Sequence, residues 1–84
     1  MSRPTHAIDE AGWAQFVAAR TVGDVIDGRV VHVVPFGSFI RTDEGVDGLA
    51  PQSAWPTLPE LDSRIRARIT AIDLHNRRFS LGPI

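Results

Sequence analysis

The sequence predicts an all-β fold: a five-stranded antiparallel barrel preceded by a short N-terminal α-helix. From Val22 onward, short runs rich in β-branched residues are separated by Gly and Pro, which is typical of a small barrel or sandwich. A helical pattern is confined to the residues before this point. The length of 84 residues sets the scale of one modest core. Because the chain has no cysteine, a disulfide framework and a thiolate metal site are both excluded.

The N-terminal segment, residues 1–21, is expected to be a tail followed by a helix packed on the barrel. Asp9 is a suitable N-cap for a helix that runs to about Arg20. Trp13 and Phe16 lie on one side of this helix. We expect them to pack over one end of the domain rather than to stack on a ligand.

The barrel itself is expected over residues 22–84. Its predicted strands are 25–34, 39–42, 46–50, 64–72 and 78–81. The first strand is expected to be bent or bulged near Gly28. Three prolines rule out a strand between the third and fourth, so residues 52–62 are expected to form a loop with one helical turn. Five strands with a long, bent first strand match the oligonucleotide-binding barrel, whose closure hides the strand edges.

The fourth strand concentrates positive charge in a chain of net charge −1. Its residues alternate between an apolar set expected to face inward, Ile65, Ala67, Ile69 and Ala71, and an outward row of Arg64, Arg66 and Arg68. Each guanidinium can bind a phosphate in a bidentate manner, so the row is a candidate electrostatic track for nucleic acid. An ordinary solvated strand face is the alternative explanation.

Several short motifs follow one another in a recognisable order. They are Val22-Gly23-Asp24-Val25, Gly28-Arg29-Val30, Val33, Phe36-Gly37-Ser38-Phe39-Ile40, Gly48-Leu49, Ser53, Ile72-Asp73, Asn76-Arg77-Arg78 and Ser80-Leu81. With these motifs, residues 22–82 resemble the S-one-type RNA-binding domain, which is repeated in a ribosomal protein and found in several ribonucleases. The resemblance implies a non-catalytic domain that binds single-stranded RNA.

The resemblance also implies roles for individual residues. Phe36 and Phe39 match the positions that stack on bases, while Asp73 and Arg77 match a pair that contacts the nucleic acid or fixes the loop beside it. If Ile40 faces the core, alternation places Phe39 outside next to Arg41, which we expect to contact phosphate. The alternative is that both phenylalanines belong to the core of a small barrel.

The chain departs from the family pattern at three places. Pro51 stands where the family often has a histidine that contacts nucleic acid, and Asp62 stands where a glycine commonly precedes the fourth strand. The loop over residues 52–62 is several residues shorter than is usual in the family. It carries Trp55, which is either a replacement stacking surface or a lid on the core. We favour the lid.

Other function classes have less support in the sequence. The three histidines show no metal-ligand spacing, so we expect no catalysis, no metal and no cofactor. We expect a cytoplasmic monomer without a membrane span, and leave open whether it docks on a ribosome or a ribonuclease assembly. The isoelectric point of about 6.2 and the absence of lysine favour an alternative function, a protein–protein interaction module that has lost nucleic-acid binding.

Overall fold

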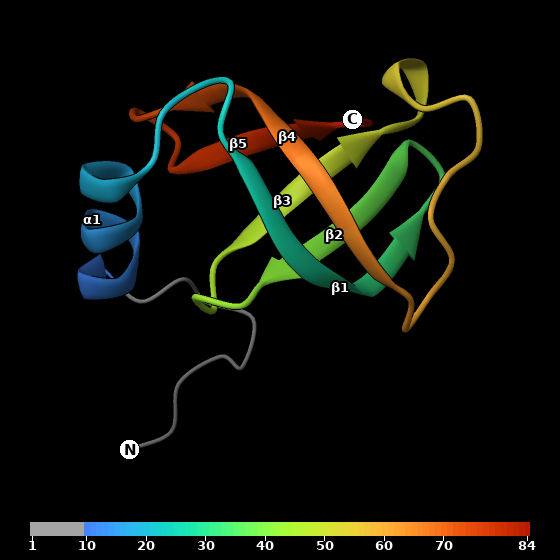
Figure 1. The fold of residues 1–84 in the computed structure, drawn as a ribbon, viewed down its shortest axis with the longest axis horizontal. Helices are drawn as coiled ribbons and strands as arrows, with labels where there is room; N and C mark the ends of the chain where they lie inside the picture. The colour runs from blue at the N-terminus through green and yellow to red at the C-terminus, as the bar shows by residue number, and fades with distance from the viewer. Residues whose placement is uncertain (1–9) are drawn as a thin grey trace.

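Five strands form a closed barrel in the order β1-β2-β3-β5-β4 (Figure 1). The computed structural model describes residues 10–84. In it the strands are β1 (Val25–Val34), β2 (Gly37–Thr42), β3 (Asp47–Pro51), β4 (Arg64–Asp73) and β5 (Arg78–Gly82). The predicted strands therefore all exist, and their ends differ from the predicted ones by at most two residues. The 3₁₀ turn η1 (Gln52–Ala54) supplies the helical turn expected after the third strand.

The predicted five-stranded barrel is confirmed, with one pairing of different direction. The neighbouring strands run antiparallel except β3 and β5, which pair in parallel through Leu49 and Ser80. A parallel pair requires a crossover connection. The segment between Pro51 and Arg78, which contains η1 and β4, is that crossover.

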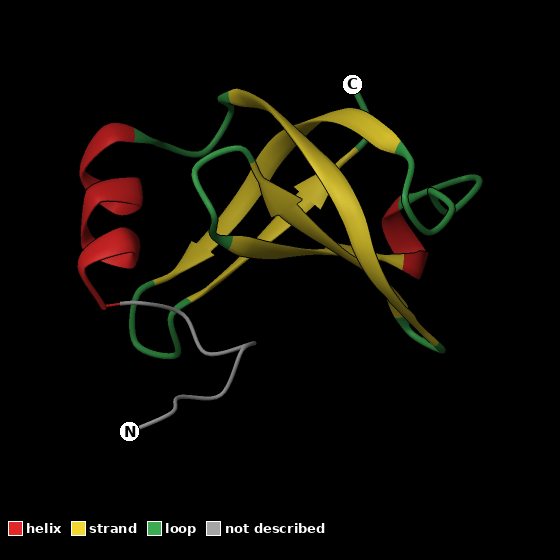
Figure 2. Ribbon diagram, turned by 90° about the horizontal axis from the view of Figure 1, so that it is seen from below, coloured by secondary structure: helices red, strands yellow, loops and turns green. Residues whose placement is uncertain are grey.

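The helix α1 (Glu10–Ala19) stands at one end of the barrel, and the connection between β3 and β4 lies at the other (Figures 1 and 2). Trp13 and Phe16 are buried, as expected. The Phe16 ring lies 4.5 Å from the ring of Phe79 on β5, centroid to centroid, so the helix shares the barrel core. The expected cap, Asp9, lies outside the described residues, and the division of the chain at residues 21 and 22 stays a prediction.

Alternation along the strands fills the barrel interior. The strand residues of the buried core are Ile26, Val30, Ile40, Ala50, Ala67, Ile69, Phe79 and Leu81. Trp55 packs against this core, and its indole Nε1 donates a hydrogen bond to the carbonyl oxygen of Leu81 at 2.8 Å. These contacts fit the lid rather than a second stacking surface.

Two bulges bend the long strands. In β1 the register shifts at Val31, and in β4 it shifts at Thr70. The expectation that Ala71 faces inward was wrong, because the bulge before it turns this residue out to the solvent. The bulge expected near Gly28 in β1 lies three residues further on, at Val31.

Gly28 has a different role, since it lets β1 and β2 approach closely. A Cβ atom at Gly28 would lie 2.6 Å from the carbonyl oxygen of Arg41 and 2.7 Å from Cγ2 of Ile40. Any larger side chain would therefore push the two strands apart.

Among residues 10–84, no helix is both long and apolar enough to cross a membrane.

Candidate nucleic-acid interface

An open cleft of about 1300 Å³ lies on the outer surface of β2, β3 and β5. The end of β1 and the turn between β4 and β5 border it. Five of the eight predicted site residues line this cleft: Phe36, Phe39, Arg41, Asp73 and Arg77. The barrel thus brings together residues that lie up to 41 positions apart in the chain.

The aromatic part of the cleft consists of Phe36 and Phe39. Phe36, in the turn between β1 and β2, is 59% exposed, and Phe39 on β2 is half-buried. Their ring centroids are 6.3 Å apart with the planes at 88°. Neither ring belongs to the buried core, so the core alternative does not hold for either phenylalanine. Of the two, Phe36 offers more open surface.

Arg41 is held in place beside the rings. Its Nε donates a hydrogen bond to Asp47 Oδ1 at 2.8 Å, and its Nη2 donates one to Oδ2 at 3.0 Å. The pKa of Arg41 is raised above its ordinary value, mainly by the hydrogen bonds to Asp47 and secondly by the negative charge of the Asp47 carboxylate. The guanidinium is therefore fixed and fully charged, while the carboxylate partly offsets its charge within the cleft.

The turn between β4 and β5 is organised by Asp73. Its Oδ1 accepts a hydrogen bond from the backbone N–H of Asn76 at 3.2 Å, and its Oδ2 accepts one from Nδ2 of Asn76 at 2.9 Å. These bonds, the side-chain one foremost, lower the pKa of Asp73 below its usual value. The next residue, Arg77, has a left-handed backbone with φ of 54°. Asp73 thus fixes the turn that carries Arg77.

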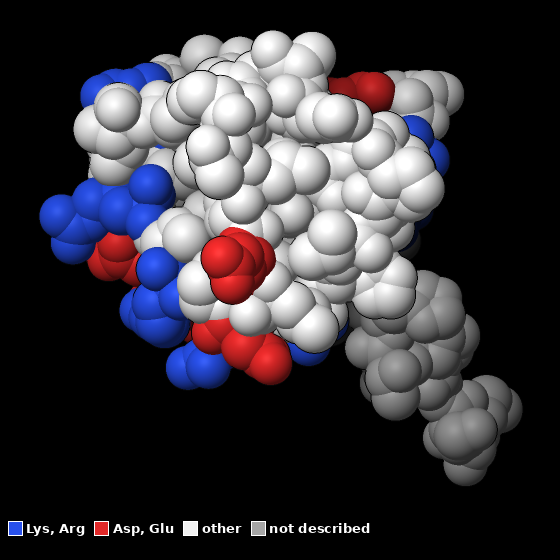
Figure 3. Space-filling view, turned by 90° about the vertical axis from the view of Figure 1, so that its right-hand side faces the viewer, with Lys and Arg blue, Asp and Glu red and all other residues white. Residues whose placement is uncertain are grey.

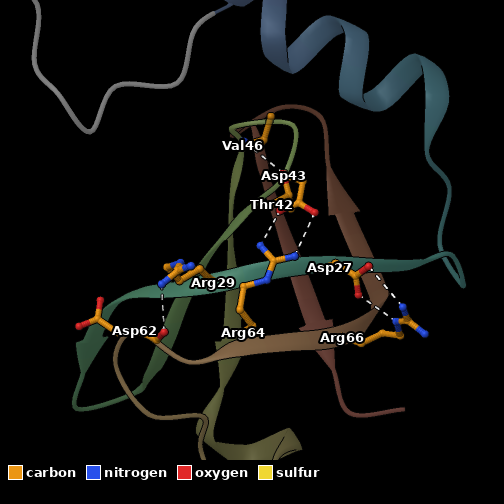
Figure 4. A network of polar contacts seen from close by, with 8 residues as sticks. All are labelled: Asp27, Arg29, Thr42, Asp43, Val46, Asp62, Arg64 and Arg66. Atoms are coloured by element: carbon orange, nitrogen blue, oxygen red, sulfur yellow. Dashed lines mark hydrogen bonds and ion pairs between the residues drawn. The ribbon is translucent and has the colours of Figure 1, made fainter.

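The three arginines of β4 lie outside the cleft. They do form the outward row that alternation predicts, but they are on the part of β4 that pairs with β1. Figure 4 shows Arg64 and Arg66 each facing an aspartate of a neighbouring segment. The N–O distances are 2.8 Å from Arg64 to Asp43 and 2.8 Å from Arg66 to Asp27.

These ion pairs neutralise most of the row. The hydrogen bond from Arg66 lowers the pKa of Asp27, and the one from Arg64 lowers the pKa of Asp43, so both carboxylates are ionised at neutral pH. Arg68 donates a hydrogen bond to the carbonyl oxygen of Gly23 at 2.9 Å. Figure 3 shows positive and negative side chains side by side along one edge of the molecule. A role of this row in RNA binding stays a prediction.

The cleft also contains residues to which the sequence reasoning gave no role. His32 is exposed and lines the cleft, with its ring centroid 6.5 Å from that of Phe39. Arg78 and Asn76 are further lining residues. Arg78 was visible in the family motif, but nothing in the local pattern pointed to His32.

Within residues 10–84, no group of three or more His, Asp or Glu side chains could hold a metal ion.

The comparisons with known proteins point to one family. Residues 20–82 match the S1 RNA binding domain. The small ribosomal subunit protein bS1 of Mycobacterium leprae is 33% identical over 87 residues, an alignment that covers 90% of this chain. The chain spans only 18% of the length of that relative.

Solved structures share the fold. The uncharacterized protein MJ1198 of Methanocaldococcus jannaschii has a TM-score of 0.68 at 20% identity, over 77% of this chain and 93% of that one. Mycoplasma genitalium RNase R, solved in complex with ribose-methylated single-stranded RNA, has a TM-score of 0.67 at 23% identity. That match covers 75% of this chain and 13% of the ribonuclease. On the match over residues 20–82 and the bS1 similarity, the chain belongs to the S1 RNA binding domain family.

Proposed function

We propose that the chain binds single-stranded RNA in the cleft without catalysing a reaction. Bases stack on Phe36 and Phe39, and Arg41 and Arg77 contact the phosphates. The single observation that carries this proposal is the pair of rings, Phe36 exposed and Phe39 half-buried, in the same cleft as these two arginines. Every base has a π-face that can lie on an aromatic ring, while the guanidinium groups suit the phosphates on either side.

The proposed mode of binding gives weak sequence preference. Stacking and phosphate contacts do not read the hydrogen-bonding edges of bases. Contact with about three phosphates, from Arg41, Arg77 and Arg78, corresponds to a slope of about −2 in a plot of log K against log salt concentration. We expect a Kd in the micromolar range or weaker, since a micromolar Kd corresponds to about −8 kcal/mol.

The comparisons support this proposal at the level of the family. The relatives include a small ribosomal subunit protein and a ribonuclease structure that contains single-stranded RNA. In both, the matched region is a small part of a larger protein. We infer that this domain works within, or docked on, a larger RNA-handling assembly such as a ribosome or a ribonuclease.

Arg64, Arg66 and Arg68 have a secondary place in the proposal. Their position outside the cleft, and the pairing of Arg64 with Asp43 and of Arg66 with Asp27, favour a long-range electrostatic contribution over direct phosphate contact. Such a contribution is screened at physiological salt within about 8 Å. Replacing the three arginines should therefore matter less than replacing Arg77 alone.

The test is a fluorescence anisotropy titration of a labelled single-stranded RNA at about 0.05 M and about 0.2 M salt. Loss of one stacking surface costs about 1 to 3 kcal/mol, so Phe39→Ala should weaken binding by about 5- to 150-fold. Leu61→Ala is the control, because it also removes a large apolar side chain, but one that is 56% exposed and lies outside the cleft. Circular dichroism of each variant verifies that it is folded.

The outcome separates RNA binding from the alternative function. Binding that weakens with salt and depends on Phe39 supports the proposal. If the wild-type protein does not bind RNA, or binds it equally at both salt concentrations and with either variant, the proposal is wrong. Association with a protein partner would then favour the interaction module.

A further inference from the structure

His32 occupies a place in the cleft that strand alternation alone would not give it. In β1 the even-numbered residues Ile26, Gly28 and Val30 face the interior, so regular alternation would turn residue 32 inward as well. The bulge at Val31 shifts the register by one, and His32 becomes the cross-strand partner of Phe39. Bulges commonly redirect a side chain in this way beside a functional site.

The result is a third ring next to the two phenylalanines. Phe39 is the neighbour of both, with centroid distances of 6.3 Å to Phe36 and 6.5 Å to His32. The His32 and Phe39 planes are inclined by 53°, so the two rings do not stack on each other. The exposed imidazole thus keeps surface that a base can cover.

The inclination of the rings sets the shape of RNA that fits. Bases lying flat on these rings would be inclined to one another as the rings are, by 88° for Phe36 and Phe39 and by 53° for His32 and Phe39. Bases lying on neighbouring rings must therefore be unstacked from one another. An extended single strand can adopt this arrangement, whereas a duplex cannot.

We propose that His32 is a third stacking surface, which extends the RNA-binding row of Phe36 and Phe39 by one nucleotide and selects extended single strands over duplex. This inference rests on the proposed function of the cleft. The imidazole contributes its ring face, so another aromatic side chain at position 32 can replace it. An amide side chain, which offers hydrogen bonds but no ring, cannot.

The experiment compares variants of the full chain in titrations with oligouridylates of about two to six nucleotides. His32→Ala should weaken binding of the longer oligonucleotides by about 5- to 30-fold, and its affinity should stop rising one nucleotide earlier than that of wild type. His32→Phe should retain binding, and His32→Gln should behave like His32→Ala. Val33→Ala is the control, since Val33 is the next residue of β1, is 49% exposed and does not line the cleft.

The outcomes separate this inference from the proposed function. If Phe39→Ala weakens binding but His32→Ala matches Val33→Ala, the third surface is refuted and the RNA site stands. If His32→Phe loses as much affinity as His32→Ala, stacking by the ring is refuted. If the wild-type protein does not bind RNA, both proposals are wrong. Because His32 is exposed, these variants should fold, and circular dichroism verifies it for each.

Discussion

Replacing Arg77 by glycine should weaken RNA binding and at the same time make the domain more stable than the alanine variant. Arg77 has a φ of 54°, in the left-handed region that residues with a side chain adopt at a cost. Arg77→Gly and Arg77→Ala both remove the guanidinium and whatever contacts it makes. Only glycine also removes the backbone penalty, so the difference in stability between the two variants reports that penalty less the entropy that glycine adds to the unfolded chain.

The size of the difference follows from the backbone conformation. A left-handed conformation costs a residue other than glycine about 1 to 2 kcal/mol. Glycine avoids this cost, but it lowers the stability by about 0.5 to 1 kcal/mol because it increases the conformational freedom of the unfolded chain. The free energy of unfolding of Arg77→Gly should therefore exceed that of Arg77→Ala by about 0.5 to 1 kcal/mol. For a domain of this length, the Tm of Arg77→Gly should be higher by about 2 to 8 °C.

Two assays of the same pair of variants test this reasoning. Thermal unfolding followed by circular dichroism gives the Tm difference. RNA titration should show both variants weakened to the same extent, with the salt slope shallower by about 0.7, the value of one phosphate contact on a single strand. Equal Tm values would refute the left-handed turn, and unchanged RNA affinity would refute the contact between Arg77 and phosphate.

Two further predictions concern packing and pH. A Cβ at Gly48 would lie 2.4 to 2.9 Å from three ring atoms of Phe79, and this ring packs against Phe16. Gly48→Ala should therefore lower the free energy of unfolding, measured by urea denaturation, by about 1 to 3 kcal/mol. An unchanged midpoint of the urea transition would show that the Phe79 ring is free to move. The hydrogen bond from Arg66 lowers the pKa of Asp27 in the folded protein. The ionised carboxylate therefore stabilises the fold at pH values above the pKa of Asp27 in the unfolded chain, about 4. This contribution is lost as the pH falls from there through the pKa in the folded protein. Asp27→Asn should therefore flatten the fall in Tm between about pH 4 and pH 2, and an identical pH profile for both proteins would contradict this.

Much of the barrel could be predicted from the sequence because its strands are local patterns. The β-branched run of β1, the period of two in the first half of β4 and the prolines after β3 each act over a few residues. Alternation also placed Phe39 outside the core, since its neighbour Ile40 is buried. The same reasoning failed at Ala71, because a bulge shifts the register in a way that depends on the partner strand.

The composition of the cleft could be predicted only in part. The family motifs identified Phe36, Phe39, Asp73 and Arg77, which the structure brings together. His32 carries no local signal, since its position depends on a bulge opposite Phe39.

The sequence by itself determined the strands, their inward and outward residues up to the two bulges, and the aromatic and charged side chains available for binding. Only the tertiary structure decided which of these share a surface. Closure of the barrel sets Arg64 and Arg66 on the part of β4 beside β1, where Asp43 and Asp27 neutralise them, and leaves Arg41 with the rings. The physical reason is that a period of two fixes the side of one strand, whereas the pairing of distant strands fixes how those sides meet.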